Sequence, residues 1–370
     1  MSDDEADPEL LELLRQHIHG KPAVSAEPDT GVLSSMEAVY NDSIDVSIDM
    51  LSTRHAAESI YEQMSATKFS TDSWTDNELH PKAKDAATLA FIFTMDLLNF
   101  CFWSEKSEDE RFAIEYRGKK WTGYWSLVAA LQRALDEADN SGIPITSSDF
   151  WQSEEELTLD LMKHIFRSAT AEEDPMLSSR LAILREAGMV MYEDFNCSFE
   201  TLISSANGSA ARLVNTLSDR FPCFRDEAPW PGRRQPVRFL KRAQILVADV
   251  WAAFGGTSYG AFDDIHKLTM FADYRVPQIL SSMNCLMYSP PLMAKITAKE
   301  IIESRSSFEM QIRAASVWCV ELIRREIVKN HPETEINAVL IDFYLYDTMK
   351  KWEAEGKETL PHHRTRSVWY

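Results

Sequence analysis

The chain has 370 residues, of which 45% are hydrophobic and 11% aromatic, so it can bury a substantial core and is not globally disordered. Its formal net charge of −20 at pH 7 argues against a broad basic footprint for long DNA or RNA, but it allows a local basic pocket for a small anion. The 12 glycines are about 3% of the chain, roughly half the usual share, which disfavours Gly-rich phosphate loops and β-propellers and favours helices.

Residues 1–32 are expected to form an acidic tail, followed by one domain over residues 33–370. The tail contains Pro and Gly and one short amphipathic patch at 10–17. From about residue 34 onward, apolar residues recur at helical spacing, and no linker separates two units. The N-terminus shows no basic stretch followed by an apolar one, so no signal peptide is predicted and the cytoplasm is the expected compartment.

The domain is predicted to be mainly helical, with one small β element. Segments 86–103, 241–254 and 308–327 carry the apolar spacing of helices. The first is apolar on nearly all sides, as in a central buried helix, and Asp96 and Asn99 interrupt it, so we do not expect it to span a membrane. Residues 112–116 and 121–125 flank Arg117-Gly118-Lys119, which is typical of a β-hairpin.

Neither a disulfide framework nor a metal site is predicted. The five cysteines are widely scattered and no pair has metal-ligand spacing. His362 and His363 are adjacent, so their side chains diverge in any regular element, and a surface or capping role is expected. We therefore expect no metal and no cofactor.

The stretch from Gly256 to Gly260 matches the G-x-S-x-G pattern of a hydrolase nucleophile elbow. That chemistry requires a strand before the serine and a helix after it. Here the preceding segment is predicted to be helical and the following one is an acidic loop. The pattern is therefore interpreted as a loop.

Asp96 lies in the middle of the apolar run FIFTMDLLNFCFW. An ionised side chain in such a position costs several kcal/mol unless it is paired. One interpretation is a structural aspartate satisfied by an arginine or by helix N–H groups. The other is an aspartate that faces a polar cavity with Asn99 nearby on the same helix.

Asp273 precedes Tyr-Arg-Val-Pro, which suits the start of a helix, because Asp caps free N–H groups and Pro277 is tolerated in the first turn. Capping alone is one explanation. The alternative is that this carboxylate, with Phe271, receives a planar amine-bearing ligand. Residues 264–287 as a whole are predicted to form helix, tight turn and helix, the shape used by helix-hairpin-helix base glycosylases.

Asp342 lies in INAVLIDFYLYDTMKKW, where an apolar run delivers one aspartate to the start of an aromatic helix. Helix-hairpin-helix glycosylases place their catalytic carboxylate in this way. Asp347 is the competing candidate, and spacing alone does not decide between them.

Several long stretches resemble one family, the queuosine salvage proteins, in a single collinear order from about Ser34 to Tyr370. These stretches are HPKAKDAATLAFIFTMDLLNFCFWSE, YRGKKWTGYWSLVAALQRALDEA, GIPITS, FPCFRDE, KRAQILVADVW, LTMFADYRVPQIL, IDFYLYD and PHHRTRSVWY. Two departures are visible. Asn77 stands where family members often carry a His, so that residue's role is absent here or has passed to His80, and Tyr346 replaces a Trp in the family's L-W-D motif.

The resemblance implies a helical fold related to helix-hairpin-helix DNA glycosylases. It also implies hydrolysis of the N-glycosidic bond of queuosine 5′-monophosphate, with release of queuine for tRNA modification and of ribose 5-phosphate. The expected partner is thus a small-molecule substrate, with no long nucleic acid and no membrane, and the chain is expected to be a monomer.

This reaction suggests a role for each candidate residue. The Asp342 carboxylate is expected either to stabilise the oxocarbenium-like sugar by its charge or to form a covalent bond to it. Asp273 binds the amine edge of the base and Phe271 stacks on it, while Asp96 or Asp264 meets its cationic aminomethyl arm. Asn77 and Tyr346 are further candidates for substrate binding. The candidates for the 5′-phosphate are Lys241, Arg242, Arg275 and Arg313.

Two other functions remain open at this stage. A non-catalytic binder of queuine or modified nucleosides would keep the pocket without hydrolysis. A hydrolase of unphosphorylated queuosine would differ only in its substrate. Comparing activity on the nucleoside and on the nucleotide distinguishes these readings.

Overall fold

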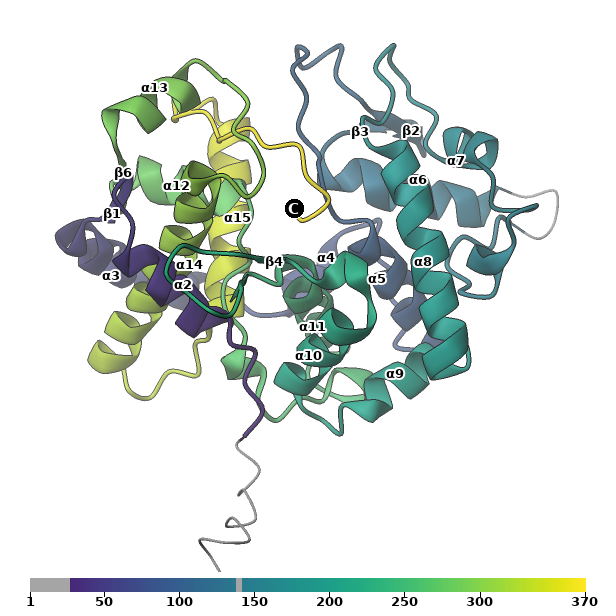
Figure 1. Ribbon diagram of the computed structural model, residues 1–370, viewed down its shortest axis with the longest axis horizontal. Coiled ribbons are helices and arrows are strands. Elements are labelled where there is room, and N and C mark those ends of the chain that lie inside the picture. The colour runs from purple at the N-terminus through teal and green to yellow at the C-terminus, as the bar shows by residue number, and fades with distance from the viewer. Residues whose placement is uncertain (1–26, 138–141) are drawn as a thin grey trace, which may run out of the picture.

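The computed structural model describes residues 27–137 and 142–370. These ranges are mainly helical and contain three two-stranded antiparallel sheets. The helices form two groups that lie side by side in Figure 1, and one hydrophobic core runs through both. The predicted mainly helical fold with a small β element is confirmed, whereas the division into a tail and one domain stays a prediction. No helix in the described ranges is long and apolar enough to cross a membrane.

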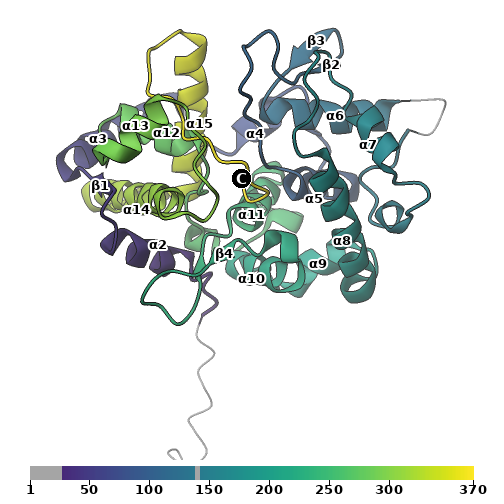
Figure 2. The ribbon, with the colours of Figure 1, turned by 45° about the horizontal axis from the view of Figure 1, so that its top comes forward.

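The first group is centred on the long helix α14, Ser307–Asn330. Helices α2, α3, α12 and α15 pack against it, and Figure 2 shows α14 between α2 and α12. Strands β1 and β6 pair antiparallel beside it. The remaining bounds in this group are α2 Val32–Asn41, β1 Val46–Ile48, α3 Met50–Thr67, α12 Arg275–Ser282, β6 Leu286–Tyr288, α13 Pro290–Thr297 and α15 Ala338–Ala354.

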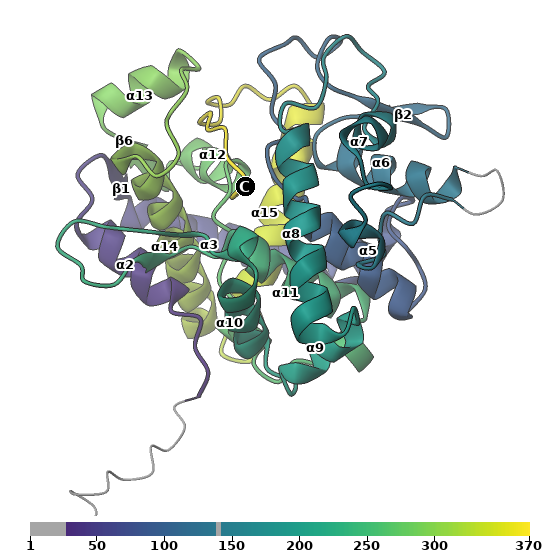
Figure 3. The same ribbon diagram turned by 45° about the vertical axis from the view of Figure 1, so that its right-hand side comes forward.

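The second group is centred on α5, Ala86–Leu97, which packs against α11, Lys241–Ala253. Both helices are buried on most sides. Figure 3 shows α8 in front of this group, with α9 and α10 below it. The remaining bounds are α4 Asp72–Asp76, β2 Ile114–Tyr116, β3 Lys119–Trp121, α6 Tyr124–Asp136, α7 Leu159–Ile165, α8 Leu177–Phe195, α9 Phe199–Ser205, α10 Ala210–Arg220, β4 Glu227–Ala228 and β5 Val237–Arg238.

The C-terminal residues 361–370 run between the two groups, where all three ribbon views place the C-terminal end. The backbone N–H of Cys101 donates to the backbone oxygen of Tyr370 at 3.1 Å. The indole N–H of Trp103 donates to the backbone oxygen of Thr365 at 2.8 Å. An isolated bridge joins Arg364 to Ile301 on the other side. The last segment of the chain therefore connects both groups.

Helix α5 begins and ends for identifiable reasons. The Asp85 side chain accepts from the backbone N–H of Thr88 at 2.9 Å and caps the first turn. The helix was expected to reach residue 103, but it ends at Leu97, and Cys101 has a left-handed φ of 57°. Residues 98–103 are not helical, and the Arg180 guanidinium donates to the backbone oxygens of Leu98 and Phe100, so these carbonyl groups are satisfied outside a helix.

A hairpin is present as predicted, with Ile114 opposite Trp121, but its second strand β3 is Lys119–Trp121 and not residues 121–125. Residues 124 and 125, however, begin α6 instead of ending a strand. The intervening Gly123 adopts φ 64° and ψ −144°, a conformation that side-chain-bearing residues avoid, so the chain turns there.

Helices predicted over 241–254 and 308–327 are present as α11 and α14. The helix, turn and helix expected over 264–287 is wrong in its first half. A 3-10 turn at Ile265–Lys267 is followed by a non-helical stretch to Tyr274, and only then by α12. The G-x-S-x-G stretch follows the C-terminus of α11 and contains a 3-10 turn at Ser258–Gly260, so the nucleophile elbow is excluded as expected. The amphipathic patch at 10–17 lies outside the described residues.

Candidate active site

A cavity of about 930 Å³ lies between the two groups of helices. Its wall is built from α4, α11, α15, the start of α6, the stretch before α12 and the C-terminal segment. A cavity of this size fits a nucleotide-sized ligand. Six residues with carboxyl side chains line it, and they are Asp76, Asp249, Asp273, Asp342, Asp347 and Glu353.

Asp342 lies in the first turns of α15, whose N-terminus is capped by the Asn337 side chain. Its Oδ1 accepts a hydrogen bond from the backbone N–H of Phe271 at 3.1 Å. Burial raises the pKa of Asp342 well above its usual range, and the nearby charge of Asp273 adds to this, while the bond from Phe271 opposes it. The sequence predicted this carboxylate, and the structure places it in the cavity wall. Asp347, one turn further along α15, also lines the cavity, and burial raises its pKa to about 6.

The capping predicted for Asp273 is confirmed, and its role in ligand binding stays a prediction. Its Oδ1 accepts from the backbone N–H groups of Arg275 and Val276, each at 3.0 Å, so it caps α12. The same side chain lines the cavity. Burial raises the pKa of Asp273, and the ammonium of Lys241 opposes that shift. Capping uses one carboxylate oxygen, so the second is free to meet a ligand.

Lys241 brings a positive charge to these carboxylates from the first residue of α11. Only 6% of the residue is exposed, and its Nζ donates to the backbone oxygen of Asn99 at 3.4 Å. Burial lowers its pKa, while the charges of Asp273 and Asp342 raise it. Lys241 thus partly neutralises the acidic floor of the cavity.

Aromatic side chains also line the cavity. The ring of Trp74 stacks on His80 with centroids 4.0 Å apart. His80 Nδ1 lies 2.7 Å from the backbone oxygen of Trp74, so Nδ1 carries the proton and Nε2 accepts from the Tyr124 hydroxyl at 2.8 Å. Burial lowers the pKa of His80 to about 4, which keeps the imidazole neutral at pH 7. Asn77 lines the cavity, and its Oδ1 accepts from the backbone N–H of Leu79 at 2.9 Å.

Phe271, Arg275 and Tyr346 also line the cavity, as the sequence analysis proposed. The Phe271 ring lies 6.1 Å from that of Phe343. Arg275 is held by Gln278 and by an ion pair to Glu353 at 3.3 Å. Further cations around the cavity were not singled out from sequence, and they are Lys106, Arg111, Lys120, Lys299, Lys350 and Arg364.

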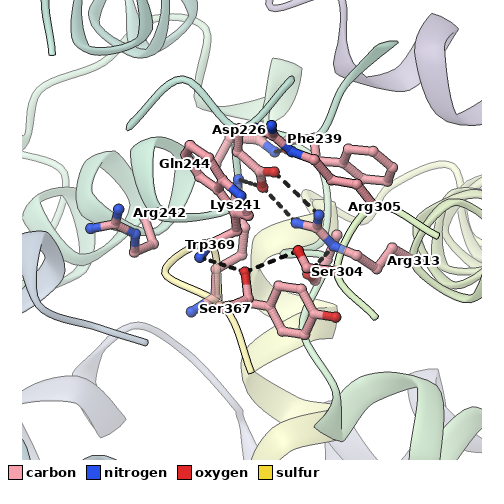
Figure 4. A network of polar contacts seen from close by, with 12 residues as sticks. Asp226, Phe239, Lys241, Arg242, Gln244, Ser304, Arg305, Arg313, Ser367 and Trp369 are labelled. Carbon is pink, nitrogen blue, oxygen red and sulfur yellow. Dashed lines mark hydrogen bonds and ion pairs between the residues drawn. The ribbon is translucent and has the colours of Figure 1, made fainter. Parts of the chain in front are cut away.

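Arg313 does not line the cavity, and its expected role as a phosphate ligand is corrected. Its guanidinium is buried and forms an ion pair with Asp226, from which Nη1 lies 3.2 Å (Figure 4). Its Nε donates to the backbone oxygen of Ala272 at 3.0 Å. A second carboxylate, Glu309, lies 3.5 Å from Nη1. Because Ala272 lies between Phe271 and Asp273, the hydrogen bond from Arg313 holds the backbone segment that carries these two site residues.

The expected role of Arg242 as a phosphate ligand is also corrected, because this residue does not line the cavity. Figure 4 shows its side chain pointing away from the Arg313 network. Its guanidinium donates to the backbone oxygens of Leu97 and Cys223 and lies over the Phe100 ring at 5.1 Å. The sequence did not reveal this, because an arginine that satisfies buried carbonyl groups and one that binds phosphate have the same local pattern.

Two expected carboxylates lie outside the cavity lining. Asp264 accepts from the Ser209 hydroxyl at 2.7 Å and from the backbone N–H of Ala210, so it caps α10. Asp96 is fully buried behind the wall, where its Oδ1 accepts from Asn99 Nδ2 at 2.9 Å. Neither position supports direct contact with a substrate arm.

Asp249 was missed by the sequence analysis, although a signal was present. It lies in the apolar helical run AQILVADVWAAF, as Asp96 lies in its own apolar run. Asp249 lines the cavity while only 4% of the residue is exposed. The same test, a lone aspartate in an apolar helix, would have found both residues.

The surface or capping role expected for the two adjacent histidines is wrong. His363 is 3% exposed, and its Nε2 lies 3.2 Å from the Tyr370 hydroxyl. His362 lines the cavity, with its ring 4.7 Å from that of Tyr274. Their side chains diverge as expected, but both are enclosed because the C-terminal segment passes between the helical groups. Within residues 27–137 and 142–370, no three His, Cys, Asp or Glu side chains are grouped to hold a metal.

Comparison with known proteins adds to this geometry. A family model described as queuosine salvage protein matches residues 79–370. A Schizosaccharomyces pombe protein named queuosine 5′-phosphate N-glycosylase/hydrolase is 40% identical over 353 residues, 92% of this chain and 99% of that protein. Proteins of the same name from Mus musculus and Sphaerobacter thermophilus are each 39% identical, over 93% and 92% of this chain and 99% and 98% of their own lengths.

Proposed function

The chain belongs to the queuosine salvage protein family, and we propose that it hydrolyses the N-glycosidic bond of queuosine 5′-monophosphate in the cavity described above. The products are queuine, which returns to tRNA modification, and ribose 5-phosphate. The observation that carries the proposal is the Asp342 carboxyl group, which the backbone N–H of Phe271 holds at the cavity wall beside Asp273 and Lys241.

Asp342 is the catalytic carboxylate in this proposal. Breaking a ribosidic C–N bond develops positive charge on C1′ and the ring oxygen, and an ionised carboxylate beside the sugar stabilises that charge. Burial raises the pKa of Asp342, so the empty site favours its neutral form, whereas Lys241 and a cationic sugar favour the ionised form, and the Asp342 proton passes to solvent before the C–N bond breaks. The interaction is thus strongest in the transition state, as catalysis requires. The same carboxylate then accepts a proton from the attacking water.

Asp273 and Phe271 hold the base. The carboxylate oxygen of Asp273 that does not cap α12 accepts from the N1–H and 2-amino edge of the base, and the Phe271 ring stacks on its face. Asn77 and Tyr346 lie in the same cavity and complete the contacts to the substrate.

Lys241 and Arg275 remain the phosphate candidates from the sequence, because both line the cavity. Of the two, Arg275 is the better placed, since Lys241 is surrounded by carboxylates whose charge it already balances. The guanidinium of Arg275 offers the planar fork that suits phosphate oxygens.

The remaining features of the proposal concern the whole chain. A relation to helix-hairpin-helix DNA glycosylases is supported by the helical fold and by a cavity aspartate at the start of α15. We also propose that the chain is a cytoplasmic monomer. We further propose that it does not bind long nucleic acid, and the net charge of −20 supports this last point.

A product assay tests the function. Purified protein is incubated with queuosine 5′-monophosphate or with queuosine, and free queuine is measured by chromatography. Release from the monophosphate, lost in Asp342→Asn, is the expected result. Release mainly from the nucleoside would make the chain a nucleoside hydrolase, and saturable binding without release would make it a binder.

A further inference from the structure

Asp96 leaves one buried carboxylate oxygen without a hydrogen-bond donor. Asn99 satisfies its Oδ1, but Oδ2 has no donor within the described part of the chain. The residue is fully buried in the middle of α5. An ionised oxygen left in this state would lose its hydration without replacement, which is costly enough that another species must satisfy it.

The neighbouring group is a second carboxyl, that of Asp249. Helices α5 and α11 pack directly against each other, and the two side chains are within hydrogen-bonding reach across that interface. A carboxylate offers no donor to another carboxylate, which explains why Asp96 Oδ2 lacks one. The contact becomes favourable only when a proton lies between the two groups.

The surroundings do not provide enough positive charge to keep both groups ionised. Lys241 and Arg242 favour the ionised forms, but Arg242 donates to backbone oxygens and Lys241 is shared with Asp273 and Asp342. The other groups near the pair are the neutral side chains of Tyr124 and Trp74 and the carboxyl group of Asp342, whose negative charge raises the pKa of Asp249 further. Burial raises the pKa of Asp96 to about 7 and that of Asp249 well above its usual range. Two carboxyls in such a site share a single proton.

We propose that Asp96 and Asp249 hold one shared proton at neutral pH and that Asp249, which lines the cavity, donates it to the departing base. This inference rests on the proposed function. A 7-deazaguanine base has a carbon where purine hydrolases commonly protonate a ring nitrogen, so it needs another acid. Asp249 is a catalytic residue in this proposal, and Asp96 is a positioning residue that keeps the proton on the pair.

The step balances without a further reactant. The C1′–N bond breaks, and its electron pair stays on the glycosidic nitrogen, which takes the proton from Asp249. The oxygen of water bonds to C1′, and the proton that this water loses passes to the Asp342 carboxylate. That proton returns through solvent to the Asp96–Asp249 pair, and the enzyme is restored.

The test measures kcat against pH for queuosine 5′-monophosphate and for ribose 5-phosphate carrying a 4-nitrophenyl leaving group. The second substrate needs no acid, because nitrophenolate leaves unaided. Asp249→Asn is expected to lower kcat on the nucleotide about 10²–10⁴-fold, with KM within a few-fold, and to retain activity on the nitrophenyl substrate. Asp342→Asn is expected to lose activity on both substrates.

The Asp96→Asn variant distinguishes a proton that Asp96 shares with Asp249 from a purely structural role of Asp96. It removes a neighbouring negative charge, so Asp249 ionises more readily and the decline of kcat at high pH moves to lower pH. Asp264→Asn is the matched control, because it changes another buried aspartate that lies away from the cavity and leaves a capping side chain. Its pH profile should equal that of the unmodified enzyme.

Several outcomes overturn the inference. The first is an unchanged dependence of kcat on pH in Asp249→Asn. The second is an equal loss of kcat on both substrates in that variant, and the third is an unshifted pH dependence of kcat in Asp96→Asn. An unmodified enzyme that cleaves neither substrate instead contradicts the proposed function. If the variants do not fold, infrared spectroscopy of the unmodified protein still tests the inference, since the absence of any protonated carboxyl band at pH 7 refutes the shared proton.

Discussion

The backbone N–H of Phe271 donates to Asp342 Oδ1 across 3.1 Å and so joins the stretch before α12 to the start of α15. The next residue, Ala272, accepts at its backbone oxygen from Arg313 Nε, and the one after it, Asp273, caps α12 while lining the cavity. Three consecutive residues therefore fix one carboxylate, supply a second and attach both to a buried arginine. The geometry of the site depends on this short non-helical stretch.

Replacing the catalytic carboxylate should abolish turnover without unfolding the protein. We expect Asp342→Asn to lower kcat about 10²–10⁴-fold, because the variant loses the charge that stabilises the sugar cation. Its melting temperature should be close to that of the unmodified enzyme, since burial already disfavours the ionised form. Asp347→Asn is the matched comparison from the same helix. A larger loss in Asp347→Asn would transfer the catalytic role to that residue.

Two substitutions at Asp273 separate capping from ligand binding. Asn caps helices about as well as Asp, so Asp273→Asn should leave the melting temperature nearly unchanged and raise KM about tenfold. Asp273→Ala should show the same KM defect and also lose about 1 kcal/mol of unfolding free energy. Thermal denaturation and steady-state kinetics measure the two effects. An unchanged KM in Asp273→Asn would leave capping as its only role.

Removing the buried guanidinium of Arg313 should lower the free energy of unfolding. Arg313→Met leaves Asp226 and Glu309 buried without their partner, and we expect a loss of about 3–5 kcal/mol in the free energy of unfolding. Arg167→Gln removes a surface ion pair and serves as the control, with an expected loss below about 1 kcal/mol. Urea denaturation measures both values. Similar small losses in the two variants would show that the buried pair contributes little.

Arg275 should determine the preference for nucleotide over nucleoside. We expect Arg275→Gln to lower the ratio of kcat/KM for queuosine 5′-monophosphate over queuosine about 10–100-fold, which corresponds to one charge-assisted hydrogen bond. Arg313→Lys keeps a positive charge outside the cavity and should leave this ratio unchanged. A ratio that responds to Arg313→Lys but not to Arg275→Gln would reverse the assignment.

The buried carboxyl of Asp96 should make stability depend on pH. Its pKa rises to about 7 on folding, so between about pH 4 and pH 7 the folded state binds more protons than the unfolded state. Stability from this group is therefore complete at low pH and declines as pH rises through that window. Asp96→Asn should flatten the decline and gain stability relative to the unmodified protein at pH 8 more than at pH 4. Parallel pH profiles of denaturation midpoints would contradict this.

The sequence by itself determined the helical class, the hairpin and the core of α5, α11 and α14, because apolar periodicity and turn residues act over a few neighbouring positions. It also proposed Asp342 and Asp273 as site residues, and both line the cavity. Asp249, like Asp96, is a single aspartate in an apolar helical run, but it was not recognised from the sequence as a site residue.

Only the tertiary structure decided which charged groups face the cavity. Arg275 and Arg313 were both predicted to bind phosphate, yet one lines the cavity and the other pairs with Asp226, 87 positions away in the chain. Asp264 caps a helix that begins 54 positions earlier, and His363 is enclosed by a terminal segment that lies between two groups of helices. Burial and charge pairing depend on neighbours brought together by folding, and those neighbours are not encoded in local spacing.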